Sequence, residues 1–347
     1  MRIKKKIKVV VLMGGKSPEH EISIISGREV VGNLDKKKYE VLPIIIAKDG
    51  KRWRLASKKA ILTLPDPLKF KGIRKDITIP QSKELQGVAG VADKGIDVVF
   101  VAMHGPFGED GTVQGMLELA GLAYTGSGVT ASAIGMDKLM FRKVMRAEGI
   151  PVPKSTSKFP CFVKPHNQGS SVGASIVRNK KELAKAMKLA RKYSDKVLVE
   201  EYLVGKEVTC AVLGNEDPKA LPVIEIVPLK GEFFDYQSKY TESGAREIVP
   251  ARISKALTKK VQEMAVKVYK AIGCRGFGRV DFILKDNRSP VVLEINTIPG
   301  LTPMSLLPKA AKEAGYSYPA LLEAIIKYAS FKDGPCRKPQ NFKESCR

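Results

Sequence analysis

Short, continuously apolar runs alternate with amphipathic stretches along most of the chain. Residues 7–13, 41–47 and 96–103 are almost wholly apolar, as in strands that are buried on both faces of a sheet. The pattern between the first two runs predicts a helix over about residues 19–34. Strands that alternate with helices are typical of an α/β domain with a parallel sheet. The stretch 55–91 has weak periodicity and many lysines, and we interpret it as an elaboration of this domain.

The rest of the chain continues this alternation with further strands and helices. Strands are expected at 161–164, 174–177, 197–202, 207–213, 222–227, 278–284 and 291–296. Helices are expected over 113–120, in two stretches up to 148, over 181–193, 254–272 and 319–328, and near 305. The interval 233–250 lacks clear periodicity, and long loops of this kind in compact domains are usually functional lids.

Composition places the chain among soluble globular proteins. Its length of 347 residues suggests two or three packed lobes, and its 44% apolar and 28% charged content argues against disorder and disulfide scaffolds. No run of about 18 apolar residues occurs, so we expect no membrane span. The run 7–13 ends in Gly-Gly rather than at a small-residue cleavage site, so we read it as a strand and expect a cytoplasmic protein.

The formal net charge of +24 raises the question of nucleic acid, but the pattern disfavours it. The lysines are spread along the chain, and the aromatic residues, only 7%, do not interleave with them as stacking platforms would. We therefore expect a solvated basic surface and no nucleic-acid partner. The five cysteines are scattered without a C-x-x-C pair, and with three histidines they show no zinc-type spacing.

Polar residues at alternate positions stand out in two of the predicted strands. Arg279 and Asp281 share one face of their strand, and Glu294 and Asn296 share one face of theirs. The four groups converge if the two strands are paired neighbours. Two carboxylates and an amide oxygen suit Mg²⁺, and Arg279 offers a planar donor for a phosphate or a developing oxyanion. One such pair is commonly a solvated face, but two pairs joined by a hairpin favour a metal site.

A second candidate site begins at Lys164, at the end of a predicted strand. The small, flexible loop 168–173 follows it and could wrap phosphate oxygens with its backbone N–H groups, although ordinary hairpin turns have similar sequences. A P-loop is excluded because Val10 stands where the first glycine of a Walker A motif ending in 15–17 belongs. The glycines at 276 and 278 enter a strand rather than a helix, which disfavours a dinucleotide site.

Several short segments together resemble the D-alanine–D-alanine ligase family. They are GGKSPEHE at 14–21, HGPFGEDGTVQG at 104–115, YTGSG at 124–128, MDK at 136–138, the 164–173 loop, and LEINTIPGLT at 293–302. Their order and spacing match from about residue 7 to residue 328. The resemblance implies an α/β ATP-grasp fold with an N-terminal parallel-sheet (pre-ATP-grasp) domain. It divides the chain into a substrate domain (1–126), a central ATP-grasp lobe (127–204), a C-terminal metal-binding lobe (205–330) and a basic tail (331–347).

The resemblance also implies which residues bind ATP and metal. Lys138 and Lys164 hold the phosphates, and the loop with Ser170 and Ser171 closes over them. The adenine and ribose contacts fall on Glu200, Glu201, Leu203 and Glu207. Two Mg²⁺ ions, with Mn²⁺ as an alternative, are held by Asp281, Glu294 and Asn296.

The substrate and catalytic roles follow from the same resemblance. Glu19 holds the ammonium group of the first D-alanine, and His104 lines the substrate site. Arg279 and the backbone of Gly300 stabilise the tetrahedral oxyanion. The carboxylate of the second D-alanine is bound by Lys239 and Ser305, next to Leu306. A hydrogen-bond network of Glu19, Ser170 and Tyr240 joins the three lobes.

The expected reaction is the ATP-dependent ligation of two D-alanines through a D-alanyl phosphate, for peptidoglycan precursor synthesis. The hexapeptide 235–240, with Lys239 and Tyr240, resembles the members that use D-alanine, and D-lactate-using relatives lack that tyrosine. A D-alanine–D-lactate or D-alanine–D-serine ligase of the same fold is the alternative. The resemblance further implies a homodimer, with D-alanine and ATP as the small-molecule partners.

Overall fold

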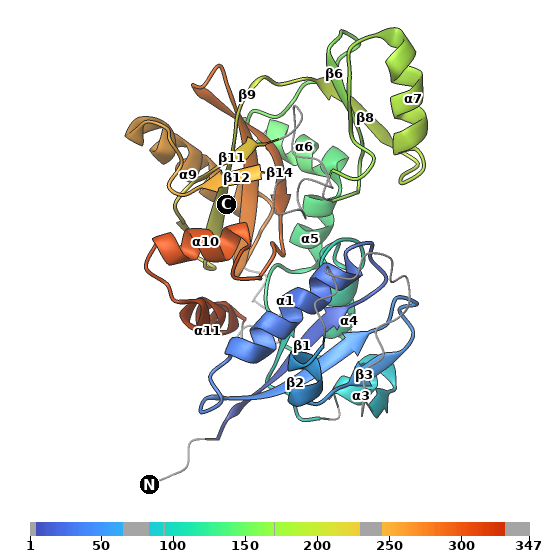
Figure 1. The fold of residues 1–347 in the computed structure, drawn as a ribbon, viewed down its shortest axis with the longest axis vertical. Helices are drawn as coiled ribbons and strands as arrows, with labels where there is room; N and C mark the ends of the chain where they lie inside the picture. The colour runs from blue at the N-terminus through green and yellow to red at the C-terminus, as the bar shows by residue number, and fades with distance from the viewer. Residues whose placement is uncertain (1–4, 65–82, 93, 170, 230–244, 330–347) are drawn as a thin grey trace, which may run out of the picture.

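The computed structural model describes residues 5–64, 83–92, 94–169, 171–229 and 245–329. These residues form three separate sheets, of five, three and six strands, each covered by helices (Figure 1). None of the helices in these ranges combines the length and apolar character that crossing a membrane requires. The sheets follow one another along the chain, so each sheet corresponds to one contiguous part of the sequence.

The first sheet has the strand order β4-β3-β2-β1-β5. Its inner strands β1 (Ile7–Gly14), β2 (Tyr39–Ile46) and β5 (Val98–Val101) pair in parallel, near the apolar runs that predicted them. The predicted parallel sheet is confirmed in these strands, and two antiparallel strands extend it at one edge, β3 (Trp53–Leu55) and β4 (Lys83–Leu85). These two strands have three residues each, too few to show a period along the chain.

Helices cover both the sheet and its edge in this first domain. They are α1 (His20–Asn33), α2 (Lys58–Leu62), α3 (Gly87–Ala92) and α4 (Thr112–Leu119). Helix α1 confirms the helix expected over 19–34, and its buried face packs against β1. At Gly27 the helix approaches Met13 so closely that an added Cβ would lie 2.7 Å from that side chain. The start of α1 lies next to the carboxyl end of β1, since the His20 ring contacts the Gly15 carbonyl through Nδ1 at 2.8 Å, and the predicted substrate residues begin there.

The second sheet is a small antiparallel lobe of order β7-β6-β8. It comprises β6 (Cys161–Pro165), β7 (Ser175–Val177) and β8 (Val197–Glu201), with α7 (Lys180–Ala190) packed on it. Only five buried apolar residues make up its core: Cys161, Val163, Val177, Ala186 and Ala190. So small a core means that polar contacts with the neighbouring lobes contribute much to the position of this lobe.

Two helices connect the first domain to the small lobe. Helix α5 (Val129–Met136) is followed directly by α6 (Lys138–Ala147). Asp137 caps α6, because its Oδ1 accepts hydrogen bonds from the backbone N–H groups of Leu139 at 2.9 Å and Met140 at 3.1 Å. This cap places Lys138 in the first turn of the helix. The apolar face of α6 belongs to the core of the third sheet rather than to that of the small lobe.

The third sheet has the order β12-β11-β9-β13-β14, with β10 paired to β9. Its strands are β9 (Gly205–Leu213), β10 (Lys219–Ala220), β11 (Ile224–Pro228), β12 (Ala245–Ile248), β13 (Phe277–Lys285) and β14 (Ser289–Asn296). Helix α9 (Lys255–Ala271) packs on β9 and β13. The interval 233–250 was expected to be a loop throughout, but it includes β12, which pairs with β11. Residues 233–244 of that interval lie outside the described residues.

The last two helices return to the first domain. Helices α10 (Leu306–Glu313) and α11 (Tyr318–Tyr328) contribute Leu307, Leu321 and Ile325 to the same core as the first sheet. An ion pair of 2.8 Å between Lys38 and Glu323 adds to this contact. Segments almost 300 residues apart in sequence are thus packed together, which closes the third sheet onto the first domain (Figure 1).

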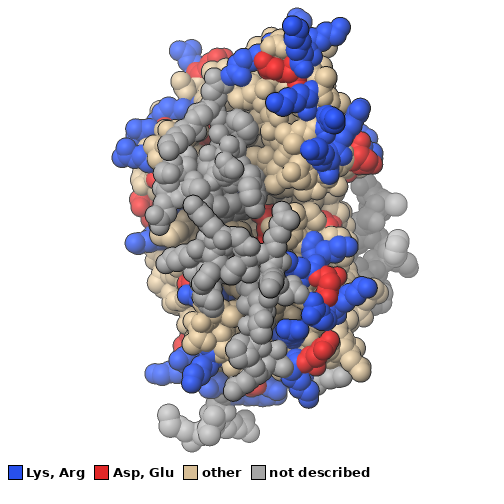
Figure 2. All heavy atoms as spheres, turned by 45° about the vertical axis from the view of Figure 1, so that its right-hand side comes forward, with Lys and Arg blue, Asp and Glu red and all other residues tan. Residues whose placement is uncertain are grey.

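Basic residues are spread over the face of the molecule drawn in Figure 2 rather than gathered in one place. On the face drawn in Figure 2, lysines and arginines occupy several separate positions, and acidic side chains lie among them. Inside the protein, Cys161, Cys210 and Cys274 are buried free thiols, in agreement with the scattered cysteine pattern. Cys336 and Cys346 lie outside the described residues.

Gly14 ends β1 in a conformation that only glycine tolerates. Its φ is +86°, and a Cβ there would lie 2.3 Å from the carbonyl oxygen of Ile46. We expect Gly14→Ala to lower the free energy of unfolding by about 3 kcal/mol or more, from backbone strain plus the clash. Gly149, with φ +66° and open space around it, is the matched control, and Gly149→Ala should cost only about 1–2 kcal/mol. Equal losses in chemical denaturation would contradict the predicted clash.

Candidate active site

A cavity of ≈ 540 Å³ lies between the small lobe and the third sheet. Its volume is in the range of small-molecule sites. Nine of the predicted ATP- and metal-binding residues line it: Lys138, Lys164, Ser171, Glu200, Glu201, Leu203, Glu207, Asp281 and Glu294. Apolar side chains such as Phe162, Ile226 and Leu293 complete the wall. Residues from both lobes therefore form one cavity that is apolar on some sides and charged on others.

The two polar strand pairs meet as the sequence predicted. Strands β13 and β14 are paired neighbours, with Arg279 opposite Asn296 and Asp281 opposite Glu294. Arg279 holds Asp281 with two parallel hydrogen bonds, Nε to Oδ1 at 2.9 Å and Nη2 to Oδ2 at 2.8 Å. Thr209 on β9 donates its hydroxyl to the same carboxylate. Asn296 lies two register positions beyond Glu294, on the same face, and is not part of the cavity wall.

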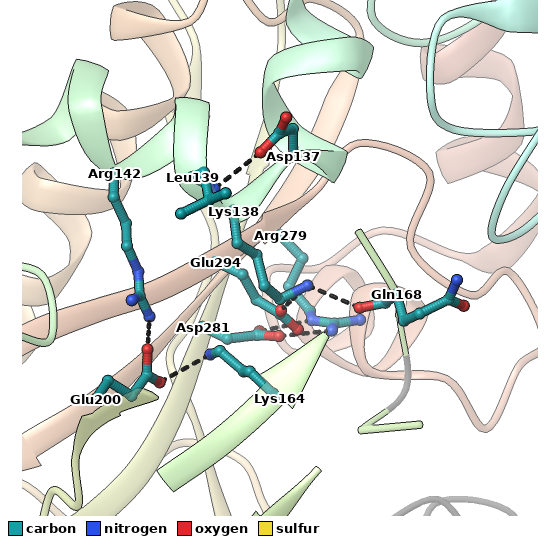
Figure 3. Close-up of polar contacts among 10 residues, drawn as sticks. All are labelled: Asp137, Lys138, Leu139, Arg142, Lys164, Gln168, Glu200, Arg279, Asp281 and Glu294. Carbon is teal, nitrogen blue, oxygen red and sulfur yellow. Dashed lines mark hydrogen bonds and ion pairs between the residues drawn. The ribbon is translucent and has the colours of Figure 1, made fainter. Parts of the chain in front are cut away.

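Lys138 connects three parts of the molecule at the cavity. Its Nζ lies 2.9 Å from Glu294 Oε2 on β14 and donates to the carbonyl oxygen of Gln168 in the small-lobe loop at 2.8 Å (Figure 3). Its own backbone N–H donates to the carbonyl oxygen of His166 at 2.9 Å. Because Lys138 begins α6, the positive end of the helix dipole adds to the charge of the side chain at this point. An anion in the cavity would meet both.

Lys164 belongs to a buried triad with Glu200 and Arg142 (Figure 3). The Lys164 Nζ lies 3.0 Å from Glu200 Oε1, and Arg142 Nη2 pairs with Glu200 Oε2. Burial lowers the pKa of Lys164, although Glu200 acts against this. Burial would raise the pKa of Glu200, but the two cations outweigh it and hold that pKa below its ordinary value. Glu200 is therefore ionised, and its negative charge lies between two positive charges. The contact of Glu200 with adenine stays a prediction.

The predicted substrate residues lie where the first domain meets the loop after β14. His104 is buried, and it contacts the Ser26 hydroxyl through Nε2 at 2.8 Å and the Ile298 carbonyl through Nδ1 at 3.0 Å. Since the carbonyl can only accept, Nδ1 carries the proton, and burial lowers the pKa of the ring, which keeps it neutral. His104 therefore links α1 to the C-terminal lobe.

Glu19, directly before α1 in the first domain, lies close to one loop of its own domain and to one loop of the small lobe. A Cβ added at Gly105 would be 2.7 Å from Glu19 Oε2, and one added at Gly169 would be 3.4 Å from the same atom. Side chains at either position would crowd this carboxylate. Glu19 is thus next to the loop that holds Ser170, but Ser170, Lys239 and Tyr240 lie outside the described residues, so their network is still a prediction.

Gly300 and Ser305 are in close contact after β14. An added Cβ at Gly300 would lie 2.8 Å from Ser305 Oγ, so any side chain would displace this serine. Ser305 Oγ also contacts Thr302 Oγ1 at 2.8 Å and accepts from the Thr302 backbone N–H at 3.2 Å. Ser305 directly precedes α10, and Leu306 is the first residue of that helix. The structure thereby places Gly300, Ser305 and Leu306 together, away from the cavity wall.

Two residues of the site had no role in the sequence reading. Glu109 is buried in the loop 104–111, accepts the Gly105 N–H at 2.6 Å and lies near Glu19. Burial, followed by the charge of Glu19, raises the pKa of Glu109 to about 8. Arg142 is the second such residue, and it is the member of the buried triad that pairs with Glu200 Oε2. A signal for Arg142 was present, because it follows Lys138 by four residues on the predicted helix and so shares its face.

The donor set suits a hard divalent cation. Asp281 and Glu294 offer carboxylate oxygens from facing register positions in the cavity wall, and Asn296, two positions further along β14, adds an amide oxygen. Within the described ranges no group of three His, Cys, Asp or Glu side chains is arranged for a metal. The predicted set has only two carboxylates, which is typical of sites where Mg²⁺ keeps water and phosphate ligands.

Comparison with known proteins identifies the family. A family model described as "D-ala D-ala ligase N-terminus" matches residues 8–127, and one described as "D-ala D-ala ligase C-terminus" matches residues 135–327. A D-alanine–D-alanine ligase of Desulforudis audaxviator is 39% identical over 339 residues, which cover 93% of this chain and 98% of that protein.

Solved structures agree with this result. The D-alanine–D-alanine ligase of Coxiella burnetii superposes with a TM-score of 0.78 at 34% identity, covering 96% of both chains. The VanG D-Ala:D-Ser ligase of Enterococcus faecalis gives the same TM-score and identity over 94% of this chain and 100% of its own. The chain belongs to the D-alanine–D-alanine ligase family, and it has the expected ATP-grasp fold with an N-terminal domain.

The raised pKa of Glu109 predicts a specific dependence of stability on pH. Between its ordinary pKa near 4.5 and the folded value of about 8, the folded state keeps a proton that the unfolded state has lost. Raising the pH through this window therefore favours unfolding. We expect wild type to lose stability from pH 5 to pH 8 relative to Glu109→Gln, which does not titrate there. Parallel stability curves for the two proteins in chemical denaturation would contradict this.

Proposed function

We propose that this chain joins two D-alanine molecules into D-alanyl-D-alanine, with ATP converted to ADP and phosphate, for peptidoglycan precursor synthesis. One observation carries the proposal: in a chain of this family, Lys138, Lys164, Asp281 and Glu294 line a single cavity between two lobes. Lysines for phosphate and carboxylates for a divalent cation, facing one cavity, are what phosphoryl transfer from ATP requires.

Activation of the first D-alanine is the step that needs ATP. A carboxylate is a poor electrophile, and phosphorylation converts it into an acyl phosphate with a good leaving group. In this proposal Lys138 and Lys164 hold the ATP phosphates from two different lobes, with Ser170 and Ser171 on the loop above them. Glu200, Glu201, Leu203 and Glu207 line the part of the cavity for adenine and ribose. Their distribution over both lobes means that the small lobe must be in place for ATP to be held.

Asp281, Glu294 and Asn296 are the residues that would hold two Mg²⁺ ions, or Mn²⁺ instead. When bound, the cations would offset the negative charge that moves with the transferred phosphoryl group. In the structure, the Arg279 and Lys138 side chains balance the charges of Asp281 and Glu294. These two side chains therefore stabilise the acidic pair inside the protein.

The remaining residues would handle the two amino acids. Glu19 binds the ammonium group of the first D-alanine, with His104 as part of the wall beside it. Arg279 and the backbone N–H of Gly300 stabilise the oxyanion that forms when the second amine attacks the acyl phosphate. Lys239 and Ser305, next to Leu306, bind the second carboxylate, and Tyr240 joins the network of Glu19 and Ser170. The 233–250 interval serves as the lid that keeps water from the acyl phosphate.

The second substrate is proposed to be D-alanine rather than D-lactate or D-serine. The fold does not separate these choices, since a D-Ala:D-Ser ligase superposes as well as a D-alanine–D-alanine ligase. Relatives that are 39% identical in sequence are named D-alanine–D-alanine ligases, which supports D-alanine. The Lys239-Tyr240 pair in the sequence favours the same acceptor.

The assembly and lobe boundaries complete the proposal. We propose a cytoplasmic homodimer on the strength of the family, with sedimentation velocity as its test. The division into 1–126, 127–204, 205–330 and a basic tail 331–347 is supported by the three sheets, which lie within 7–101, 161–201 and 205–296.

The reaction itself gives the first test. ADP release from Mg-ATP should require D-alanine, fail with L-alanine, and yield D-alanyl-D-alanine by mass spectrometry. In parallel reactions, D-lactate or D-serine added with D-alanine should not produce the mixed product at a comparable rate. A dominant depsipeptide or D-alanyl-D-serine product would refute the choice of acceptor, and absence of D-alanine-dependent ADP release by the folded protein would refute the proposal.

The carboxylates on β13 and β14 give a second test. Asp281→Asn and Glu294→Gln each keep the size of the side chain but remove a charge, and we expect either to reduce kcat by about 100-fold or more. Asp286→Asn is the matched control, because Asp286 lies exposed in the turn of the same hairpin. Melting temperatures close to wild type would show intact folds. Near-normal turnover by both cavity variants would contradict the metal assignment.

A further inference from the structure

Arg142 is a buried cation that does not reach the cavity. It lies one helical turn after Lys138 on α6, and its side chain is only 3% exposed. Lys138 and Lys164 both line the cavity, whereas Arg142 lies outside its wall. A charge buried this deeply is costly, so it is retained only where its partners compensate for it.

The contacts of Arg142 are unusually few for a buried guanidinium. Nη2 pairs with Glu200, but Nε and Nη1 have no hydrogen-bond partner among the described residues. Arginine is typically held by several bonds when buried. The fold therefore keeps Arg142 for its single ion pair with Glu200 rather than for a network of its own.

This ion pair crosses from one lobe to another. Helix α6 packs through Phe141 and Met145 into the core beneath the third sheet. Glu200 lies on β8 of the small lobe, and Lys164 lies on the neighbouring strand β6. The apolar core of the small lobe is separate and small, so the Arg142–Glu200 pair is a direct polar tie between the two walls of the cavity.

Glu200 divides its two oxygens between the two cations. Oε2 is taken by Arg142 and Oε1 by Lys164 at 3.0 Å. With Arg142 in place, Glu200 cannot pair fully with Lys164, and the triad keeps one net positive charge in a water-poor environment. Without Arg142 both oxygens would turn to Lys164, draw its ammonium group away from the cavity and cancel its charge.

We infer that Arg142 is a positioning residue that acts through Glu200 to hold Lys164, with its charge uncancelled, where the phosphates of ATP bind. The inference rests on the proposed function, in which Lys164 binds those phosphates. Arg142 itself touches neither ATP nor the amino acids. Arg142 fixes the position of the small lobe, and with it of Lys164, relative to the third sheet.

Steady-state kinetics test this role. Arg142→Met keeps the length and burial of the side chain but removes the charge, and we expect the KM for ATP to rise about tenfold. The kcat should change less than about threefold, and the KM for D-alanine should stay at the wild-type value. Arg142→Lys should recover most of the loss. Arg146, exposed one turn further along α6, provides the control Arg146→Met, which should match wild type.

Equilibrium binding separates positioning from a loss of structure. By calorimetry, Arg142→Met should weaken ADP binding about tenfold and adenosine binding much less, because only the phosphates meet Lys164. In a Glu200→Gln background, the Arg142→Met substitution should have little further effect on the affinity for ADP, because the carboxylate through which Arg142 acts on Lys164 is already absent. Arg142→Lys provides the same comparison if Arg142→Met has a lowered melting temperature.

Three results would overturn the inference. They are an unchanged ADP affinity in folded Arg142→Met, an equal loss of adenosine and ADP affinity, and full additivity with Glu200→Gln. Failure of the proposed function is a different result, since it would show as wild-type protein without D-alanine-dependent ADP release. The binding experiments use ADP and adenosine alone, so they judge Arg142 whichever amino acid the protein ligates.

Discussion

The site depends on the pairing of opposite charges that are buried or half-buried around the cavity. Three carboxylates, Asp281, Glu294 and Glu200, are each held by a cation from another position, and Glu200 by two. In a medium of low dielectric constant, an unpaired member of this set would cost several kcal/mol. Each charge therefore dictates where its partner must lie. The contacts that α6 makes through Lys138 and Arg142, to Glu294, Gln168 and Glu200, hold the lobes in register, and Lys138 and Glu294 are also proposed to take part in the chemistry.

This constraint explains why one protein needs three sheets around its site. The nucleotide cavity has one wall from the small lobe and one from the third sheet, and α6 contributes Lys138 to the wall and Arg142 behind it. The proposed amino-acid site begins at β1 and α1 and meets the C-terminal lobe through the His104 contact to Ile298. Because α10 and α11 pack on the first core, the loop with Gly300 and Ser305 is fixed beside Glu19's domain. Neither half of the site is complete within one lobe.

The sequence predicted the long elements well and the short ones poorly. Strands such as β1, β9 and β13 have enough consecutive apolar residues to show their period, and α1 and α9 have enough turns. Strands β3, β4 and β12 have three or four residues and lie at a sheet edge or next to one, where pairing with another strand decides the conformation. The antiparallel strands β3 and β4 were not predicted, and the expectation of an unbroken loop at 233–250 was wrong, for this reason.

By itself the sequence determined the family, the order of the long strands and helices, and the period-two placement of Arg279 with Asp281 and Glu294 with Asn296. These are local properties, because they depend only on spacing along the chain. Only the tertiary structure decided that Asp281 faces Glu294, that Glu200 is shared by Lys164 and Arg142, and that Glu109 is buried beside Glu19. Burial and charge pairing depend on residues far apart in sequence, and one sequence alone does not show which of them come into contact.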